Sequence, residues 1–326
     1  MKYPSQKISV AELKRGLETY PATTDDVQNS DDAIIDSELL HKANYGGLSM
    51  YAVRHTELSD MSVMVELPAA ISFNITFEGS ADISLGGIPY QIQCDRSGGP
   101  RCCAYVLNRP ELFIRYLRKH STVAHLNVFA ERQWLEARAH AAETRNMYQR
   151  LFQQHSILHF WQPSTKTIDL AKALFSAPPT DSFTHAIRHE SLTLELLAQG
   201  IDELERLSTQ IQPDDNAHIT NNRADVALKK TVDDLLLERY SISDIAASLG
   251  LSTSTLQRRF KTAFGITVDH YCRQRRLENA RRALTIDGVS IGEAAYLAGY
   301  NHTSNFLAAF KKRFRMTPSE LMKQGH

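Results

Sequence analysis

Apolar and polar residues alternate with a period near two between residues 47 and 129. Runs such as "SVMVEL", "AISFNITFEGSADISLGG" and "CCAYVL" are rich in β-branched and aromatic residues, and turns such as "LGGIPY" and "DRSGGPR" separate them. Many short strands of this kind are typical of a sandwich or a barrel. The pattern therefore predicts an all-β unit over residues 47–129.

The period changes to that of a helix in residues 130–207. The segment "SFTHAIRHESLTLELLAQGIDELERL" places apolar residues on one stripe, which includes Leu194, Leu197, Ile201 and Leu204. Such a stripe can pack on the β unit of its own chain, or it can form a dimer seam with a second copy. Both interpretations stay open at this point, and they are compatible with one another.

A polar segment, "STQIQPDDNAHITNN", occupies residues 208–222 and has no apolar periodicity and no aromatic residue. We interpret it as a linker between a first domain (residues 1–207) and a second domain (residues 223–326). A chain of 326 residues is long enough for two such domains. The predicted fold class is α+β, with a β-rich and then helical first domain and an all-α second domain.

The second domain contains a near-repeat. "SISDIAASLGLSTSTLQRRFKTAFG" is followed by "VSIGEAAYLAGYNHTSNFLAAFKKRF", with an offset of 49 residues up to the glycine and 50 after it. Each copy predicts a short helix, a turn at Gly250 or Gly299, and a second helix, which is a helix-turn-helix. The units span about 241–264 and 290–314, with Ser243 as the predicted cap of the first. A helix over residues 267–288 is expected to fix their separation.

Charge supports a polyanionic partner for this domain. From Asn222 to the end there are 17 Lys and Arg against 10 Asp and Glu, a balance of +7, whereas the remainder carries 20 against 27, or −7. A basic domain beside an acidic one suggests a polyanionic partner, and a helix-turn-helix, whose second helix can enter a major groove, indicates that this partner is double-stranded DNA. The four cysteines form neither a zinc pattern nor a disulfide framework, and adjacent Cys102 and Cys103 are expected on opposite faces of one strand.

The second helix of each unit supplies the candidate DNA contacts. Gln and Arg side chains can form paired hydrogen bonds with adenine and guanine edges, and lysines suit phosphates. The candidates are Ser254, Gln257, Arg258 and Lys261 in the first unit, and Thr303, Ser304, Leu307, Lys311 and Lys312 in the second. Because Leu307 and Ala308 stand where Gln257 and Arg258 stand in the first copy, we expect the first unit to carry most of the direct base readout.

At these residues the chain resembles the DNA-binding domain of the AraC/XylS transcription regulators, over about residues 224–323. The stretch "AGYNHTSNFLAAFKKRFRMTPSEL" is similar to the family signature. The resemblance implies a sequence-specific activator that works with RNA polymerase, and a first domain that combines a cupin-like β barrel for a small-molecule effector with helices that form a homodimer. Departures from the family pattern are Ala294, Tyr300 and Arg315, the last of which replaces a glycine at the closing turn.

The first domain resembles that of pyochelin- and yersiniabactin-type siderophore regulators, through "ISFNITFEGSADISLGG" and "YVLNRPELFIRYLRKHSTVAHLNVF". An iron-siderophore effector is one expectation, and a sugar, a fatty acid or an aromatic effector stay open. The residues that bind the effector are not identified by the sequence, and no cofactor is expected.

Two other classes of protein were weighed. A cupin-type metal enzyme requires an H-x-H pair with further ligands, and His55, His120 and His125 lack such partners in sequence. A DNA-binding protein without a signal would leave the first 200 residues unexplained. We therefore expect a regulator and not an enzyme. With no apolar run long enough for a membrane span and no secretion signal, we expect it in the cytoplasm.

Overall fold

The computed structural model describes most of the chain. The described residues are 6–9, 11–12, 22–24, 32–94, 98–152, 157–176, 182–209, 223–238, 240–285, 287–314 and 316–324. The predicted linker, residues 208–222, lies almost entirely outside them, so the predicted domain boundary stays a prediction.

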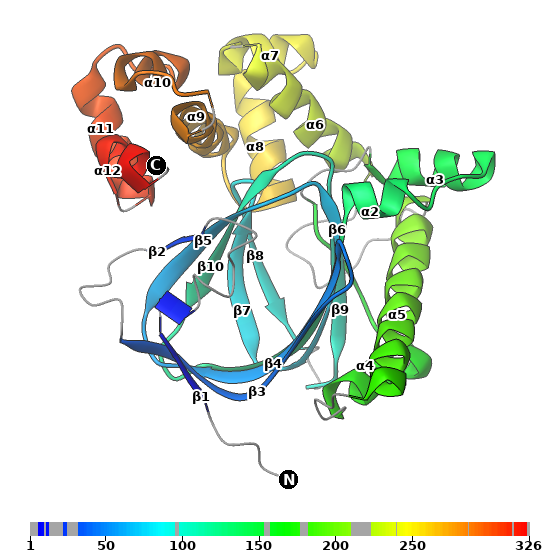
Figure 1. Ribbon diagram of the computed structural model, residues 1–326. Coiled ribbons are helices and arrows are strands. Elements are labelled where there is room, and N and C mark those ends of the chain that lie inside the picture. Colours follow the sequence, from blue (N-terminus) through cyan, green and yellow to red (C-terminus); the bar gives the residue numbers. More distant parts are fainter. Residues whose placement is uncertain are drawn as a thin grey trace.

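The first part of the chain forms two antiparallel sheets that curve around a common interior (Figure 1). In order across the larger sheet, the strands are β1 (Gln6–Ser9), β3 (Ala33–Asn44), β4 (Leu48–Glu57), β11 (Thr122–Glu131), β6 (Ala70–Glu78), β9 (Arg101–Leu107) and β12 (His159–Trp161). In the smaller sheet they are β2 (Ala22–Thr24), β5 (Met61–Leu67), β10 (Glu111–Leu117), β7 (Ser80–Leu85) and β8 (Ile88–Gln93).

Strands β3 and β12 lie outside the range that the alternation predicted. In β3 the alternation is interrupted by charged residues and by an irregularity in its pairing with β4 between Ser37 and Leu39. Strand β12 has only three residues, which is too short to show a period, and it forms through pairing with β9. Pairing with neighbouring strands therefore decides both cases, and sequence periodicity does not record it.

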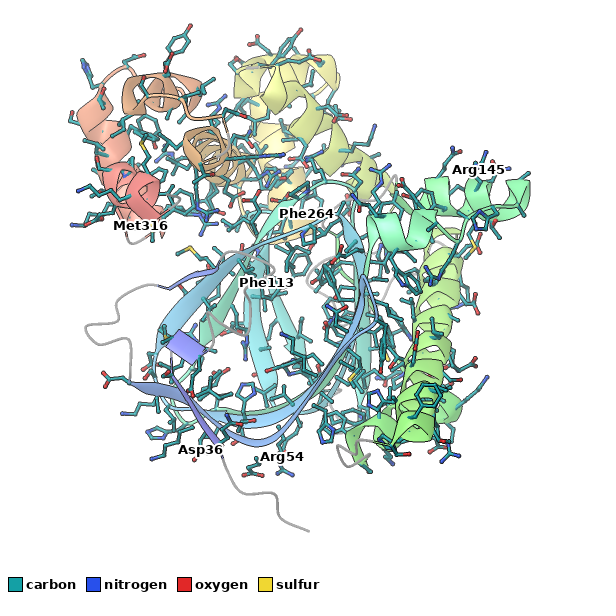
Figure 2. The ribbon with its side chains drawn as sticks, viewed as in Figure 1. Asp36, Arg54, Phe113, Arg145, Phe264 and Met316 are labelled. Atoms are coloured by element: carbon teal, nitrogen blue, oxygen red, sulfur yellow. The ribbon has the colours of Figure 1, made fainter. Side chains whose placement is uncertain are left out.

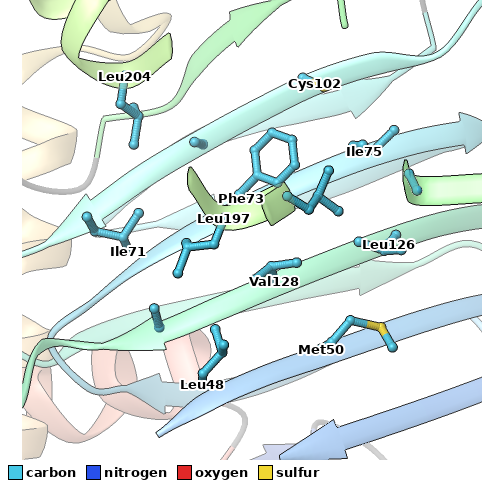
Figure 3. Packing of buried hydrophobic residues seen from close by; sticks show 14 of the residues in the cluster. Leu48, Met50, Ile71, Phe73, Ile75, Cys102, Leu126, Val128, Leu197 and Leu204 are labelled. Carbon is cyan, nitrogen blue, oxygen red and sulfur yellow. The ribbon is translucent and has the colours of Figure 1, made fainter. Parts of the chain in front are cut away.

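Alternation divides the larger sheet into an apolar outer face and a second face toward the smaller sheet. On β4, Leu48, Met50 and Ala52 are fully buried in a cluster that includes Phe73 on β6 and Leu126 on β11 (Figure 3). Four helices cover this face and contribute to the same cluster. They are α2 (Arg132–Glu136), α3 (Ala142–Phe152), α4 (Thr165–Ser176) and α5 (Phe183–Thr209).

Helix α5 buries most of its predicted stripe against its own sheet. Leu197 and Leu204 are 3% and 0% exposed and belong to the cluster beneath the helix, and Ile201 packs against that cluster. Leu194 differs, with 39% of its surface exposed. Leu197 and Leu204 are therefore core residues and offer no surface to a second copy, which corrects their assignment to a seam.

The last part of the chain is helical and contains both predicted helix pairs. Its helices are α6 (Arg223–Leu237), α7 (Ile242–Ser248), α8 (Thr253–Phe264), α9 (Val268–Thr285), α10 (Ile291–Leu297), α11 (Thr303–Phe314) and α12 (Pro318–Gln324). Helices α7 and α10 start with the same capping box, Ser241 with Asp244 and Ser290 with Glu293. Ser241 rather than Ser243 is therefore the cap of the first unit, because its hydroxyl accepts from the backbone N–H of Asp244.

Helices α6–α12 gather at one end of the two sheets (Figure 1). Two apolar clusters cross this boundary. One joins β7, β8 and β9 to α6, α8 and α9, and the other joins β5 and β10 to α9, α10 and α11. The β-rich and helical parts therefore share buried surface.

Gly200 in α5 tests how closely this helix packs on the sheet. A Cβ atom there would lie 2.8 Å from Cγ of Phe73. Alanine normally favours a helix over glycine by about 1 kcal/mol, but overpacking a core costs about 1–3 kcal/mol. We therefore expect Gly200→Ala to lower the free energy of unfolding by up to about 2 kcal/mol, as measured by urea denaturation.

Gly292 in α10 provides the matched control. A Cβ atom there meets only Ser290 Oγ, at 3.9 Å, so Gly292→Ala should raise stability by about 0.5–1 kcal/mol. Equal stabilisation by the two substitutions would show that α5 does not pack on Phe73 as described.

Candidate functional site

Helix α8 presents a polar face to solvent because its other face is fixed in the core. Leu256, Phe260 and Phe264 are at most 1% exposed. On the other side Ser254, Arg258 and Lys261 are exposed, as the sequence predicted. Ser252 caps the helix by accepting from the backbone N–H of Thr255. The result is a rigid helix whose exposed side chains are suited to hydrogen-bond base edges and phosphates.

Gln257 is less accessible than its neighbour Arg258. It is half-buried, and its Oε1 atom is buried without a hydrogen-bond partner. Arg258 is exposed. A buried amide oxygen without a hydrogen bond costs free energy. A change of rotamer, or a donor on a bound molecule, would remove that cost for Gln257.

Helix α11 repeats this geometry with different chemistry. Phe306, Phe310 and Phe314 are at most 1% exposed and anchor the helix. Four of its predicted contacts are exposed, namely Thr303, Ser304, Lys311 and Lys312. Leu307 is half-buried. The exposed charge lies in the last turn, where lysines can reach phosphates.

Asn305 is a candidate that the sequence reasoning missed. It is exposed on α11, between Ser304 and the buried Phe306. An asparagine amide can pair with the N6 and N7 edge of adenine. The signal was present in the sequence, because Asn305 is a polar residue directly before an aromatic anchor.

The turns of both units require left-handed backbone. Gly250 has a φ of 66° and Gly299 has a φ of 78°, a conformation that costs glycine little and other residues much more. The predicted departure at Arg315 lies outside the described residues.

The arginines of α9 divide into two groups. Arg275 and Arg281 are 6% and 8% exposed and form ion pairs within the protein. Arg273 and Arg282 are exposed, and Arg276 donates to the carbonyl oxygen of Tyr240. Only the second group offers charge to a phosphate backbone.

A second candidate site lies between the two sheets. The register places Tyr51, Asn127 and Asn74 side by side across β4, β11 and β6. These residues alternate with the apolar residues beneath α5, so they face the smaller sheet. Asn127 Nδ2 donates to Asn74 Oδ1 and to Ser72 Oγ, each at 2.8 Å.

Two histidines extend this polar interior. The His55 and His125 rings are 6.3 Å apart, and the Tyr51 ring lies 6.0 Å from His125. Burial, assisted by His55 and Arg115, lowers the pKa of His125 to about 3, and burial raises the pKa of Tyr51 to about 12. Both side chains are therefore neutral at pH 7, yet each keeps some accessible surface.

His55 is the least satisfied member of this group. It is 6% exposed, and neither ring nitrogen has a hydrogen-bond partner. The Glu57 carboxylate lies 3.7 Å from His55 Nε2 and accepts instead from Arg115 Nη2 of β10, at 2.5 Å. Buried polar groups in proteins are normally hydrogen-bonded, so His55 is suited to a partner that enters the interior.

The described residues contain no cluster of three His, Cys, Asp or Glu side chains that could hold a metal ion. His120, the third histidine considered from the sequence, is exposed and has a φ of 69° in a turn. Within the same described ranges, no helix combines the length and the hydropathy needed to cross a bilayer.

The four cysteines all lie in the described part of the chain, and they form no disulfide bond with one another. As predicted, Cys102 and Cys103 lie on opposite faces of β9, one in the cluster beneath α5 and the other in the cluster that contains Tyr105. Burial raises the pKa of Cys103 to about 12, so this thiol is protonated and unreactive at neutral pH.

Two family models match the chain. The model for the regulatory protein PchR N-terminal domain matches residues 44–216, and a helix-turn-helix domain model matches residues 230–324. The transcriptional activator RhaS of Yersinia pestis is 25% identical over 168 residues, which cover 50% of this chain and 58% of RhaS. The probable transcription factor PqrA of Proteus vulgaris is 36% identical over 88 residues, which cover 27% of this chain and 72% of PqrA.

Among solved structures, an AraC-type regulator from Chromobacterium violaceum is 26% identical, with a TM-score of 0.30, and the match covers 32% of this chain and 96% of that one. The helix-turn-helix model covers most of the helical part, and the PchR-type model covers most of the β-rich part. The chain belongs to the AraC/XylS family of transcription regulators and carries a PchR-type N-terminal regulatory domain. Its relatives are transcription regulators, which agrees with the expectation from the sequence.

The two recognition helices should contribute unequally to base readout. We expect Arg258→Ala and Gln257→Ala each to cost about 1–3 kcal/mol at one base pair, whereas Leu307→Ala should cost less because it loses no hydrogen bond. Lys311→Ala should weaken all sequences alike and make the salt dependence shallower. Binding-site selection with each variant beside the wild type measures these effects.

Asn305→Ala is the informative comparison within the second unit. If Leu307→Ala relaxes the second half-site as strongly as Arg258→Ala relaxes the first, the division of readout is wrong. If Asn305→Ala alone does so, the second unit reads bases through its amide.

Proposed function

We propose that this protein is a transcription activator that binds double-stranded DNA through α8 and α11 under the control of a small-molecule effector. The observation that carries the proposal is the joining, in one chain, of a PchR-type regulatory domain and a helix-turn-helix domain. The exposed polar faces of α8 and α11 support the DNA-binding part. The activator role follows the relatives, among them RhaS, and implies contact with RNA polymerase.

The effector site we propose is the interior between the two sheets, which we regard as a cupin-like barrel. Its lining combines neutral hydrogen-bonding groups, Tyr51, Asn74, His125 and Asn127, with the unpaired ring of His55. Such a lining suits a polar aromatic molecule, because it offers donors, acceptors and ring faces without net charge. A phenolate siderophore carrying ferric iron fits this chemistry and the PchR-type domain.

Ferric pyochelin is the probe that tests the effector proposal. We expect it to bind the full chain and to change its affinity for a selected operator. His55→Phe and His125→Phe should each weaken binding at least about ten-fold, since each removes a hydrogen-bonding group from a buried site. Isothermal titration calorimetry measures this, with iron-free pyochelin and ferric citrate as ligand controls.

His120→Asn is the matched histidine control, because His120 lies in an exposed turn and asparagine tolerates its left-handed backbone. Unchanged binding of ferric pyochelin by both interior variants would exclude this site. Binding of a fatty acid or a sugar in place of ferric pyochelin would retain the site and change the class of effector.

We further propose that the chain forms a homodimer through the outward face of α5. Phe183, Ile187 and Leu194 are 79%, 54% and 39% exposed, and their spacing places them along one side of the helix. Leu197 and Leu204 hold the following turns of α5 on the sheet. The proposed dimer seam thus uses Ile187 and Leu194 from the predicted stripe, together with Phe183.

Charged substitutions separate the two faces of α5. Ile187→Glu and Leu194→Glu should give folded monomers by sedimentation equilibrium, because a seam would bury unpaired charge. Leu197→Glu should instead unfold the domain. Lys172→Glu, an exposed charge change on α4, is the control that should leave self-association unchanged. A folded dimer of the Ile187→Glu, Leu194→Glu double variant would rule out this seam.

A further inference from the structure

A set of buried ionic side chains crosses the boundary between the β-rich part and the DNA-binding helices. Arg275 of α9 lies at its centre. Its Nη1 atom donates to Glu111 of β10 at 2.5 Å and to Glu278 of α9 at 2.9 Å, and its Nε lies 3.6 Å from Asp233 of α6. All four side chains are nearly inaccessible to solvent, with 3–7% of each exposed.

The same set includes a residue of the second helix-turn-helix unit, and it approaches the first unit through α6, which packs against α7 and α8. On the side of the first unit, Lys229 and Tyr271 donate to the carboxylate of Asp233, at 2.9 and 2.5 Å. On the side of the second unit, Arg313 of α11 donates to Glu278 at 2.8 Å. Ion pairs therefore connect helix α9 to α6 and to α11.

Both parts of the chain contribute charges to this set. The helices supply the cations Lys229, Arg275, Arg281 and Arg313 and the anions Asp233 and Glu278. The β-rich part supplies two further anions. Glu111 contacts Arg275, and Glu66 lies 3.9 Å from Arg281. Arg109 of the β-rich part, one-third exposed, lies 3.8 Å from Asp233 and adds a cation at the rim.

Apolar contacts and a tight turn surround the ion pairs. Phe113 of β10 packs against the cluster that contains Phe264, at the end of α8 (Figure 2). The turn between β7 and β8 approaches α9 so closely that a Cβ on Gly87 would lie 3.5 Å from the Tyr271 ring. The Arg275 and Glu111 side chains are only 7% and 3% exposed, and removing one partner of a buried ion pair is costly because it leaves the other charge buried without compensation.

Docking on the β-rich part leaves the recognition residues free. Arg258, Lys261, Ser304 and Lys311 are exposed while α9 is held in this way. The contact between the β-rich part and the helices therefore does not cover the DNA-binding faces. It acts on α9, the helix that connects the two units.

We propose that Glu111 is a positioning residue for DNA binding. Its ion pair with Arg275 fixes α9 on the β-rich part and thereby holds the two recognition helices in one relative orientation. The inference rests on the proposed function, and it assigns the regulatory domain a direct part in reading a two-part operator. If the orientation of the two helices is fixed before binding, less conformational entropy is lost when the protein binds both half-sites.

Glu111→Gln tests this in the full chain, since glutamine keeps the size of the side chain and removes its charge. The DNA probes are an operator selected with the wild-type protein, a duplex with one half-site, and the operator with two base pairs inserted. The insertion rotates one half-site by about 70°, because a duplex turn takes about 10–10.5 base pairs.

We expect Glu111→Gln to lower affinity for the intact operator about ten-fold, within the range of allosteric couplings, and to leave single half-site affinity unchanged. The wild type should lose much of its affinity on insertion, and the variant should lose less because its units are no longer fixed. Without DNA, hydrogen exchange in α9 should be faster in the variant. A purely structural defect would lower both affinities together.

Two further variants keep the test decisive. Glu66→Gln alters the Glu66–Arg281 pair, which is longer and more exposed than Glu111–Arg275, so it should lower operator affinity by a smaller factor. If Glu111→Gln does not fold, Glu66→Gln replaces it in the same experiment. Glu38→Gln removes an exposed glutamate paired with Arg54 on the far sheet and should behave as wild type.

Equal affinities and equal insertion penalties for Glu111→Gln and wild type would overturn the inference while leaving the proposed function intact. Tighter binding of both the operator and the half-site by the variant would also overturn it, since docking would then inhibit DNA binding. If the wild type selects no operator at all, the proposed function fails, and this inference fails with it.

Discussion

The burial of α9 on nearly all sides is the constraint on which the rest of the structure depends. Val268, Tyr271, Leu277 and Leu284 are buried among the helices, and Arg275 is buried with them. A buried guanidinium is tolerated only with paired anions around it, so α6, β10 and α9 itself must each bring a carboxylate to one point. That requirement determines how the helical part sits on the sheets.

The sequence predicted those features that depend on local periodicity and turn chemistry. Gly250 and Gly299, the aromatic anchors of α8 and α11, and the exposed Arg258 and Lys261 all followed from spacing, because a helix fixes which side chains share a face. The capping residue was misplaced by two positions, since Ser241 and Ser243 are both good caps and only the reciprocal bond with Asp244 decides between them.

Features set by distant contacts could not be predicted in the same way. Five arginines in the α9 segment fit a solvated face, salt bridges and phosphate contacts alike. The sequence does not show which of them are buried, because the partners of Arg275 and Arg281, Glu111 and Glu66, lie more than 160 residues earlier in the chain. The α5 stripe shows the same ambiguity. Its period fits a core face and a seam equally well, and only the position of the sheet shows that Leu197 and Leu204 are core residues. His55 looked like an isolated strand histidine until pairing placed it near His125 and Tyr51.

These placements connect the two candidate sites through short physical steps. In the interior, His55 Nε2 lies 3.7 Å from the Glu57 carboxylate, and this carboxylate accepts a hydrogen bond from Arg115 of β10. The same strand carries Phe113, packed against the cluster at the end of α8, and Glu111, bonded to Arg275. A molecule that contacts His55 or displaces Arg115 would thus act on β10, whose first residue fixes the helix between the two DNA-binding units. Because packed elements tend to shift as units rather than deform continuously, a displacement of β10 at Arg115 would also move Glu111, four residues away on the same strand.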